Sequence, residues 1–372
     1  MITSPKETVE TLFSTAGIHI NGRQPFDLQC YDDRLYGRIL SERGLGLGEA
    51  YVEGWWDAER PDMLIRRLLS AHLQEKIQVQ PGMIPSLLSA LILNRQNTEQ
   101  AKRNAAHHYN IGNDLFERML DTRIIYSCGY WKDATTLDGA QTAKLELICR
   151  KLYLEPGMTL LDIGCGWGGF AEYAAFHYGV TVTGISPAHE QVVAAKNRVA
   201  GLPVTILEKD YREITGRFDR IVSIGMLEHV GPKNYDAFFA QCQKLLKPGG
   251  MMVHHTIGGN ESLNGTDPWI EKYIFPGGVI PSLTQISAAI EKRFLIEDVQ
   301  NFGPYYDKTL MAWHDNFVAR YPEIRDQYDA RFYRMWRYYL LSCAGAFRAR
   351  EMQLWQIVMR RIEPSDIYNA VR

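Results

Sequence analysis

The stretch LLDIGCGWGGF, from Leu160 to Phe170, decides the fold class of this 372-residue chain. It begins as a β-rich run, breaks at Asp162 into a glycine-rich turn and continues as a helical pattern. The dinucleotide fingerprint is GxGxxG, whose glycines make room for a pyrophosphate at a helix N-terminus. Here Gly164, Gly166 and Gly168 alternate as GxGxG, so the turn does not match that fingerprint.

From Thr159 onward, short β-rich runs alternate with stretches long enough for one helix each. The runs are TLLDI, VTVTG, VTILE, DRIVSIG and MMVHHTI, which begin at Thr159, Val180, Val204, Asp219 and Met251. This alternation predicts an α/β fold with a doubly wound, Rossmann-like parallel sheet. Ligands of such sheets lie outside the carboxyl ends of the strands, so site residues are expected in the loops that follow the strands.

The glycine turn in this strand–turn–helix context resembles the first motif of the class I S-adenosylmethionine-dependent methyltransferases. The resemblance implies S-adenosylmethionine as the cofactor, with the glycines admitting it close to the backbone and Asp162 ordering the loop. Most of these enzymes hold the ribose hydroxyls with an acid after the second strand, but VTVTGIS ends in Ser186, so Ser186 and Gln191 are neutral candidates for that role. Asp210 and Tyr211 fall where the adenine is usually read. The full set expected to bind the cofactor is Tyr126, Ser127, Asp162, Gly164, Cys165, Gly166, Gly168, Ser186, Gln191, Asp210 and Tyr211.

Other segments of the sequence indicate which class of molecule accepts the methyl group. The (D/N/S)PP(Y/F) tetrapeptide of DNA amino-methyltransferases does not occur in the sequence. The segments that resemble the bacterial cyclopropane-fatty-acyl-phospholipid synthases are GLGEAYVEGWWD (46–57), HHYNIGNDLF (107–116), IIYSCGYW (124–131), GMLEHVGPKNY (225–235), HHTIGG (254–259), DPWIEKYIFPGG (267–278), GPYYDKTLMAW (303–313) and CAGAFRAR (343–350). The likeness covers nearly the whole chain, whereas the related mycolic acid cyclopropane synthases lack a comparable N-terminal part.

The resemblance implies that a methyl carbon is transferred from S-adenosylmethionine to the cis double bond of an unsaturated acyl chain in a membrane phospholipid, and that a cyclopropane ring then closes. The intermediate is a carbocation, so the site must exclude water and contain a base. Aromatic walls favour a cation, and the candidates are Tyr126, Tyr130, Trp131, Tyr273, Phe275, Tyr305 and Tyr306. In this family the base is thought to be a bound bicarbonate ion. By resemblance its ligands are Cys128, Glu228, His255, Tyr306 and the backbone of Ile257.

Three alternatives stay open within this site. Glu228 alone is a possible general base, because a carboxylate in an apolar pocket can have its pKa raised toward neutrality. The pair His254 and His255 suggests a metal site, but adjacent strand residues point to opposite faces, so no metal is predicted. Tyr305 and Tyr306 are ambiguous in register, and Tyr306 is chosen by the family resemblance alone.

Length predicts two domains, and the polar stretch from Asn94 to Asn104 indicates the boundary. By resemblance, residues 1–100 form a mostly helical domain that engages lipid or membrane, and residues 101–372 form the catalytic domain. The formal charge of -2 gives no indication of nucleic-acid binding. Six scattered cysteines indicate reduced thiols, and neither a signal peptide nor a membrane-spanning segment is expected. We therefore expect a cytoplasmic protein, peripherally associated with the inner face of the cell membrane, and relatives suggest a homodimer.

One segment is strongly basic: between Arg331 and Arg361 there are seven arginines and the single acid Glu351. It either binds anionic phosphate or forms a solvated helix face paired with acids elsewhere in the fold. With the amphipathic segment that carries Arg66 and Arg67, it is the candidate for membrane docking.

Two rival functions remain at this stage. One is a methyltransferase that adds a methyl or methylene branch to the acyl chain without ring closure. The other is a non-catalytic lipid-binding protein on a retained methyltransferase fold, although such a protein would have no reason to keep the complete base site.

Overall fold

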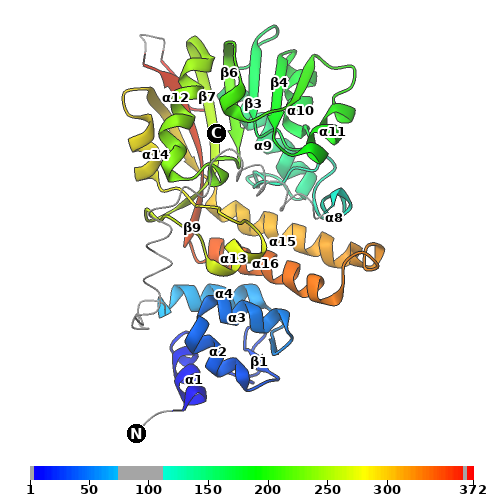
Figure 1. The fold of residues 1–372 in the computed structure, drawn as a ribbon, viewed down its shortest axis with the longest axis vertical. Helices are drawn as coiled ribbons and strands as arrows, with labels where there is room; N and C mark the ends of the chain where they lie inside the picture. Colours follow the sequence, from blue (N-terminus) through cyan, green and yellow to red (C-terminus); the bar gives the residue numbers. More distant parts are fainter. Residues whose placement is uncertain (1–3, 74–111, 363–366) are drawn as a thin grey trace. The chain divides into compact units, whose positions relative to one another are not determined.

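The computed structural model describes residues 4–73, 112–362 and 367–372, and these residues separate into two compact units (Figure 1). The sheet unit consists of the described parts of 93–265, 277–305 and 353–372. The helical unit consists of the described parts of 1–92 together with 266–276 and 306–352. The predicted boundary near residue 100 and the first part of the HHYNIGNDLF segment lie outside the described residues.

The sheet unit is built on a seven-stranded sheet of order β5-β4-β3-β6-β7-β9-β8. Neighbours from β5 through to β7 run parallel, whereas β8 and β9 pair antiparallel at the other edge. The strands are β3 (Thr159–Ile163), β4 (Thr181–Ser186), β5 (Val204–Glu208), β6 (Phe218–Ile224), β7 (Leu246–Gly259), β8 (Phe294–Asn301) and β9 (Met352–Arg361). The predicted doubly wound α/β fold is confirmed, and each of the five predicted runs lies on one of the parallel strands.

Helices cover both faces of this sheet, because alternate strand residues point to opposite sides. Leu161 and Ile221 join a core with α12 and α14, while Leu160 and Val222 join a second core with α9 and α10. The helices of this unit are α8 (Asn113–Met119), α9 (Leu137–Lys151), α10 (Gly169–Tyr178), α11 (His189–Arg198), α12 (Tyr235–Leu245) and α14 (Leu283–Ile290), with 3-10 turns η2 (Tyr211–Glu213), η3 (Leu227–His229) and η4 (Pro232–Asn234).

The first part of the chain is helical, as predicted. The helical unit contains α1 (Pro5–Thr15), α2 (Arg34–Glu42), α3 (Gly44–Val52), α4 (Pro61–Ser70), α13 (Pro268–Tyr273), α16 (Ala330–Arg348), most of α15 (Gly303–Arg320), the 3-10 turn η5 (Tyr321–Glu323) and the short ribbon β1 (Gln29–Cys30)–β2 (Trp56–Asp57). Within the described residues, no helix is both long enough and apolar enough to cross a bilayer.

Two glycines from the family-like segments allow helices of this unit to approach closely. A Cβ added at Gly345 on α16 would lie 2.6 Å from the Asp62 carbonyl oxygen at the start of α4. A Cβ added at Gly48 on α3 would lie 2.5 Å from the Trp269 ring on α13. Such separations are far inside van der Waals contact, so these glycines of the CAGAFRAR and GLGEAYVEGWWD segments serve helix packing.

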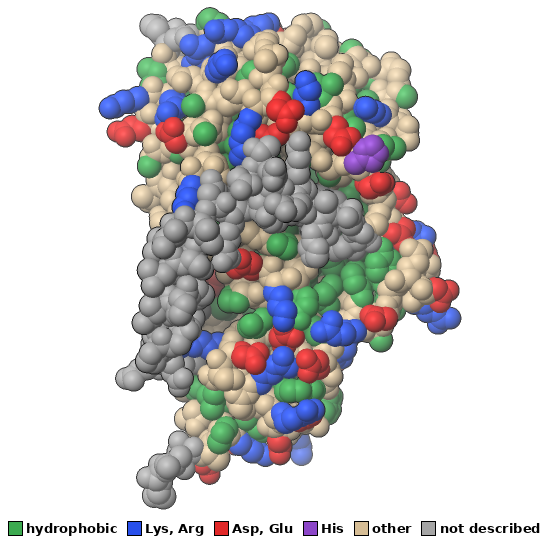
Figure 2. Space-filling view, in the orientation of Figure 1, with side chains coloured by type: hydrophobic (Ala, Val, Ile, Leu, Met, Phe, Trp, Pro, Cys, Tyr) green, Lys and Arg blue, Asp and Glu red, His purple; other side chains and the backbone are tan. Residues whose placement is uncertain are grey.

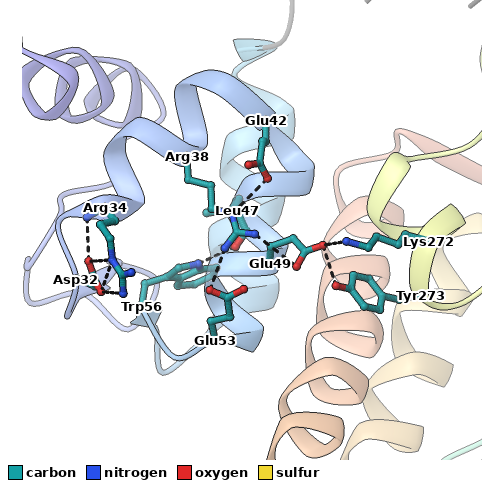
Figure 3. A network of polar contacts seen from close by, with 10 residues as sticks. All are labelled: Asp32, Arg34, Arg38, Glu42, Leu47, Glu49, Glu53, Trp56, Lys272 and Tyr273. Atoms are coloured by element: carbon teal, nitrogen blue, oxygen red, sulfur yellow. Dashed lines mark hydrogen bonds and ion pairs between the residues drawn. The ribbon is translucent and has the colours of Figure 1, made fainter. Parts of the chain in front are cut away.

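A buried carboxylate also joins α13 to α3 (Figure 3). Glu49 is 4% exposed, and its Oε1 accepts hydrogen bonds from Lys272 Nζ at 2.5 Å and from the Tyr273 hydroxyl at 2.8 Å. On its other side lies Arg38, which also pairs with Glu53 at 3.1 Å. A buried carboxylate is stable only when it is paired and hydrogen-bonded, so this network holds the 266–276 segment in the helical unit.

Four arginines of the basic segment pair with acids elsewhere in the fold, as one of the two alternatives expected, and membrane docking by this segment stays a prediction. Arg334 donates to two backbone carbonyl oxygens and pairs with Asp57, and Arg337 donates to the Tyr51 hydroxyl. Arg348 lies between two carboxylates, those of Asp62 and Asp307. Arg360 is not on the helix at all: it lies on β9 in the sheet unit, is 4% exposed and pairs with Glu297. On the face drawn in Figure 2, basic and acidic side chains are interspersed over the helical unit.

The amphipathic segment predicted around Arg66 and Arg67 is α4, which packs against α16 and buries Leu64 and Ile65. Arg67 stacks on the Phe26 ring at 3.8 Å. Arg66 is exposed, as are Arg331 and Arg350 of the basic segment, so these side chains of the predicted docking set stay accessible.

Candidate active site

The glycine turn follows β3 and leaves the backbone open. Gly164, Gly166 and Gly168 have φ of 85°, 52° and 82°, in the region that side chains with a Cβ rarely adopt. The amide nitrogens of Gly164 and Cys165 both donate to the Ile185 carbonyl oxygen at 3.0 Å, which fixes the turn to the end of β4. A Cβ added at Gly166 would meet no atom within 4 Å. The turn therefore presents backbone to open space, as a cofactor cradle requires.

Asp162 lies at the carboxyl end of β3, between Gly184 on β4 and Val222 on β6. It is 1% exposed, and burial raises the pKa of its carboxyl group to about 7. Its Oδ2 has no hydrogen-bond partner among the described residues. A buried polar atom without a partner is costly, so this carboxyl group fits a ligand that donates a hydrogen bond or carries positive charge, as the amino group of S-adenosylmethionine does.

The two neutral candidates after β4 lie together. Ser186 Oγ donates to Gln191 Oε1 at 2.9 Å, and the Ala188 amide donates to the same hydroxyl at 3.2 Å. Ser186 and Gln191 are 2% and 4% exposed, and α11 carries the glutamine. The serine therefore fixes the glutamine amide at the carboxyl edge of the sheet, where the prediction placed a ribose contact.

The acid that follows β5 caps a short turn. Asp210 is 6% exposed, and its carboxylate accepts hydrogen bonds from the Arg212 backbone and guanidinium at 3.0 and 3.3 Å. Tyr211 belongs to the core beneath α12, where its ring lies 5.1 Å from Phe238. Its side chain points into the core, so a contact with adenine would have to come from its backbone.

Glu228 follows β6 and is turned onto the end of β7. It is 7% exposed, and its Oε1 accepts a hydrogen bond of 2.6 Å from the Ile257 amide, the group that the family resemblance assigned to bicarbonate. Its Oε2 has no partner among the described residues. Burial raises the pKa of this carboxyl group to about 7, because the ionised form is poorly solvated there. Glu228 can therefore give or take a proton near neutral pH.

His255 and His254 point to opposite faces of β7, as strand alternation predicted. His254 packs its ring 5.7 Å from Phe239 in the α12 core. His255 faces Gln356, whose Nε2 lies 3.2 Å from His255 Nδ1, and its ring lies 5.9 Å from Phe302. Burial keeps the pKa of His255 well below its usual range, so its ring is neutral at pH 7.

The Gln356 contact favours one tautomer of His255. With the amide as placed, Gln356 donates to Nδ1, so the ring proton lies on Nε2. Among the described residues no acceptor lies within reach of that nitrogen. His255 is thus a neutral donor available to a ligand. No group of three His, Cys, Asp or Glu side chains in the described part of the chain is placed to hold a metal ion.

Cys128 lies in the loop that precedes α9, is fully buried, and directs its thiol to the Gly129 carbonyl oxygen at 3.3 Å. Near it, Tyr130 stacks on Phe302 at 5.0 Å and meets Tyr305 edge-on at 5.5 Å. The ring of Tyr126 lies 5.2 Å from Phe116. These rings supply apolar, aromatic surroundings of the kind that the carbocation chemistry requires.

The remaining predicted residues belong to the helical unit. Tyr306 lies on α15, where its ring packs 4.6 Å from Phe347 and 5.9 Å from Trp313. Tyr273 is held by Glu49, and the Phe275 ring lies 6.1 Å from that of Tyr339. Their part in the site stays a prediction, whereas Cys128, Glu228, His255 and Ile257 all belong to the sheet unit.

Three buried residues near this site were not singled out from the sequence. Gln356 orients His255, Phe302 covers its ring, and Lys144 on α9 donates to Ser127 Oγ at 2.7 Å. Gln356 lies on β9 and Phe302 directly follows β8, and the sequence analysis identified neither strand. Lys144 occupies an ordinary polar position of a helical pattern, so no sequence signal marked it.

Comparison with known proteins agrees with this geometry. The family model for mycolic acid cyclopropane synthetase matches residues 96–357. The chain is 51% identical over 350 residues to the cyclopropane-fatty-acyl-phospholipid synthase of Escherichia coli (strain K12), which covers 94% of this chain and 92% of that protein. It is 37% identical over 352 residues to a probable fatty acid methyltransferase of Pseudomonas putida, with 88% and 85% covered.

A solved structure gives the same result. The mycolic acid cyclopropane synthase CmaA1, complexed with SAH and CTAB, is 34% identical, has a TM-score of 0.65, and covers 69% of this chain and 97% of its own. The fold is thus similar to that of a relative whose structure was solved with SAH bound. In this chain, the open glycine turn and the Asp162 oxygen without a partner among the described residues fit a cofactor of that kind. The chain therefore belongs to the cyclopropane synthase family and is an S-adenosylmethionine-dependent methyltransferase of the cyclopropane-fatty-acyl-phospholipid synthase type.

Proposed function

We propose that this enzyme acts on unsaturated acyl chains of membrane phospholipids and uses a bound bicarbonate ion as its base. The alkene takes the methyl carbon as the carbon–sulfur bond breaks, and positive charge develops on the neighbouring acyl carbon. Loss of a proton from the new methyl group then closes the ring. Bound S-adenosylmethionine supplies the methyl group, and bound bicarbonate accepts the proton.

One observation carries the proposal: Glu228 Oε2 and His255 Nε2 are buried polar atoms without partners among the described residues. Glu228 lies in η3, which follows β6, and it accepts from Ile257 on β7, two residues beyond His255. His255 is neutral and offers one N–H, which suits an anion's oxygen. Glu228 has a pKa of about 7, so its protonated form can donate to the same anion. The Ile257 backbone holds Glu228 in place, and Cys128 and Tyr306 complete the proposed set.

The cofactor site is proposed on the glycine turn. Gly164, Cys165, Gly166 and Gly168 would admit the cofactor to the backbone, and Asp162 would accept from its amino group. Tyr126, Ser127, Ser186, Gln191, Asp210 and Tyr211 are the remaining proposed contacts.

Because the acceptor lies in a bilayer, we place the enzyme at the inner face of the cell membrane, as a peripheral protein and a homodimer. Residues 1–100 would engage the lipid. Arg66 on α4 and Arg331 and Arg350 of the basic segment are exposed cationic side chains of the predicted docking set, accessible to head groups.

The test uses purified enzyme, vesicles of a mono-unsaturated phosphatidylglycerol, and buffers freed of carbon dioxide. Activity should fall on depletion and return when bicarbonate is added. His255→Phe should lose about 100-fold in kcat, the contribution typical of a general base, because the proposed bicarbonate loses its N–H donor. His254→Phe should keep its activity because that ring lies in the core. Full activity without bicarbonate would eliminate the ion and leave Glu228 as the base.

The alternative is acyl-chain branching without ring closure, and the name of the Pseudomonas putida relative is compatible with it. The two reactions share every residue above and differ only in how the cation loses its charge. The structure of the product separates them.

A further inference from the structure

Lys144 is a fully buried lysine on α9 that the chemistry proposed above does not use. Its Nζ donates to Ser127 Oγ at 2.7 Å. Buried ammonium groups are rare unless they are paired, because desolvation of the charge is costly. Burial accordingly lowers the pKa of Lys144 to about 8, which still leaves the group mostly charged at pH 7.

The lysine is one of several anchors between α9 and the loop that carries Cys128. The Tyr130 amide donates to the Ala140 carbonyl oxygen at 2.8 Å, and Gln141 Nε2 donates to the Ser127 carbonyl oxygen at 2.8 Å. Ala140, Gln141 and Lys144 thus hold consecutive parts of residues 127–130. The loop is already held through its backbone, so the buried charge of Lys144 is not needed merely to fix the loop.

Within the described residues, no carboxylate lies within ion-pair distance of Lys144. The acid that acts on Lys144 electrostatically is Asp121, whose two oxygens accept from the backbone amides of Ile125 and Arg123 at 2.8 and 3.1 Å. A second lysine of the same helix gives the contrast. Lys151 is also fully buried, but it donates to Gln300 at 2.6 Å and lies 3.7 Å from the Asp298 carboxylate.

The charge of Lys144 reaches the proposed base site. After burial, it is the largest influence that lowers the pKa of His255, and it interacts electrostatically with Cys128. Both are proposed bicarbonate ligands, and His255 is itself uncharged. Lys144 therefore adds positive potential beside two of the proposed ligands, which favours a small anion in a low-dielectric site.

We propose that Lys144 is a positioning residue that supplies the buried positive charge for the bicarbonate ion, acting through Ser127 and the adjacent Cys128. This inference rests on the proposed function. The charge is meant for bicarbonate and not for the carboxylate of S-adenosylmethionine, and the experiment separates these two anions.

The experiment compares three variants of the full chain with the wild type. Lys144→Met removes the charge and the hydrogen bond. Lys144→Gln removes the charge but keeps an N–H donor for Ser127, and it is the variant more certain to fold. Lys151→Met is the control, because it removes an equally buried lysine of the same helix that is paired with Asp298 and has a smaller influence on His255 than Lys144 has.

Two quantities are measured for each protein: the bicarbonate concentration for half-maximal methyl transfer, and the affinity for S-adenosylmethionine by calorimetry. Both Lys144 variants should raise the bicarbonate concentration for half-maximal methyl transfer at least tenfold, which corresponds to about 1.4 kcal/mol of binding free energy. Their affinity for S-adenosylmethionine should change less than threefold. Bicarbonate should raise the thermal midpoint of the wild type, and this rise should be absent in both Lys144 variants. Lys151→Met should have a lower midpoint but bind bicarbonate within threefold of the wild type.

Three results would overturn the inference. Lys144→Gln with wild-type half-saturation would mean that the charge is not used. A parallel loss of cofactor affinity would assign the charge to the cofactor carboxylate. Wild-type enzyme with no bicarbonate dependence would remove the proposed base itself, and this result is recognised before any variant is made.

Discussion

Replacing Glu228 with glutamine should stabilise the protein at neutral and alkaline pH. The carboxyl group is fully enclosed, and burial raises its pKa from 4.5 to about 7. Glutamine has nearly the same shape and keeps a carbonyl oxygen that can accept from the Ile257 amide. The substitution therefore removes an ionisable group and leaves the surrounding contacts in place.

The sign follows from proton linkage. Below pH 4.5 the folded and unfolded states both hold the proton, so Glu228 costs nothing. Between pH 4.5 and 7 the unfolded chain loses its proton first, and the free energy of unfolding falls by about 1.4 kcal/mol per pH unit. Above pH 7 the loss levels off at about 3 kcal/mol. Glutamine does not titrate and escapes this loss.

The assay is urea unfolding of wild type and Glu228→Gln at pH 5 and pH 8, with Glu155→Gln as a control at an exposed glutamate. The stability advantage of Glu228→Gln should grow by about 2.5 kcal/mol between the two pH values. Asp162, whose pKa is also raised to about 7, titrates equally in both proteins and cancels. Glu155→Gln should show no such growth.

The reasoning is refuted if the difference between Glu228→Gln and wild type is the same at pH 5 and pH 8. That result would mean that the carboxyl group titrates near its ordinary pKa and is solvated in the folded protein. A loss of about 100-fold or more in kcat would separately favour the alternative in which Glu228 itself is the base, since a group in proton transfer contributes that much.

Two further predictions concern the cofactor turn and the helical unit. Gly166→Ala places a Cβ in the open cradle, so the dissociation constant for S-adenosylmethionine, measured by calorimetry, should rise at least tenfold. Gly201→Ala is the control, because Gly201 is also at positive φ with open space around it, and it should leave the dissociation constant unchanged. Equal affinities of the two variants would place the cofactor elsewhere. Arg348→Gln leaves two aspartates of the helical unit without their shared partner, so the free energy of unfolding should fall by about 3 kcal/mol in urea. A change below about 1 kcal/mol would mean that solvent screens this pair.

Local pattern predicted the central part of the fold well. Strands such as TLLDI at Thr159–Ile163 are buried on both faces, so they appear as short apolar runs between helical stretches. Strand alternation also separated His254 from His255 correctly, because it depends only on the period of two.

Features that depend on distant partners could not be read in this way. The run MQLWQIVMRR follows α16 directly, and it becomes β9 by pairing antiparallel with β8 from far along the chain. The arginines of the basic segment looked available because Asp57, Asp62 and Asp307, which pair with them, are remote in sequence. Charge counted along a chain does not indicate where the counter-charge will lie.

The sequence predicted which residues form the candidate site, but it did not predict their hydrogen bonds or their pKa values. Glu228 and His255 were named from their motifs, but the hydrogen bond that Ile257 gives to Glu228 depends on how η3 folds onto β7. Lys144 and Lys151 occupy polar positions seven residues apart on α9, and only burial distinguishes them from surface lysines.

The most direct test of the central claim is mass spectrometry of lipids from a host that lacks its own cyclopropane synthase and expresses this chain. Acyl chains that have gained one methylene should be resistant to an alkene-specific derivatisation, because ring closure consumes the double bond. A methylene gain in chains that still react as alkenes would contradict ring closure and assign the enzyme to acyl-chain branching.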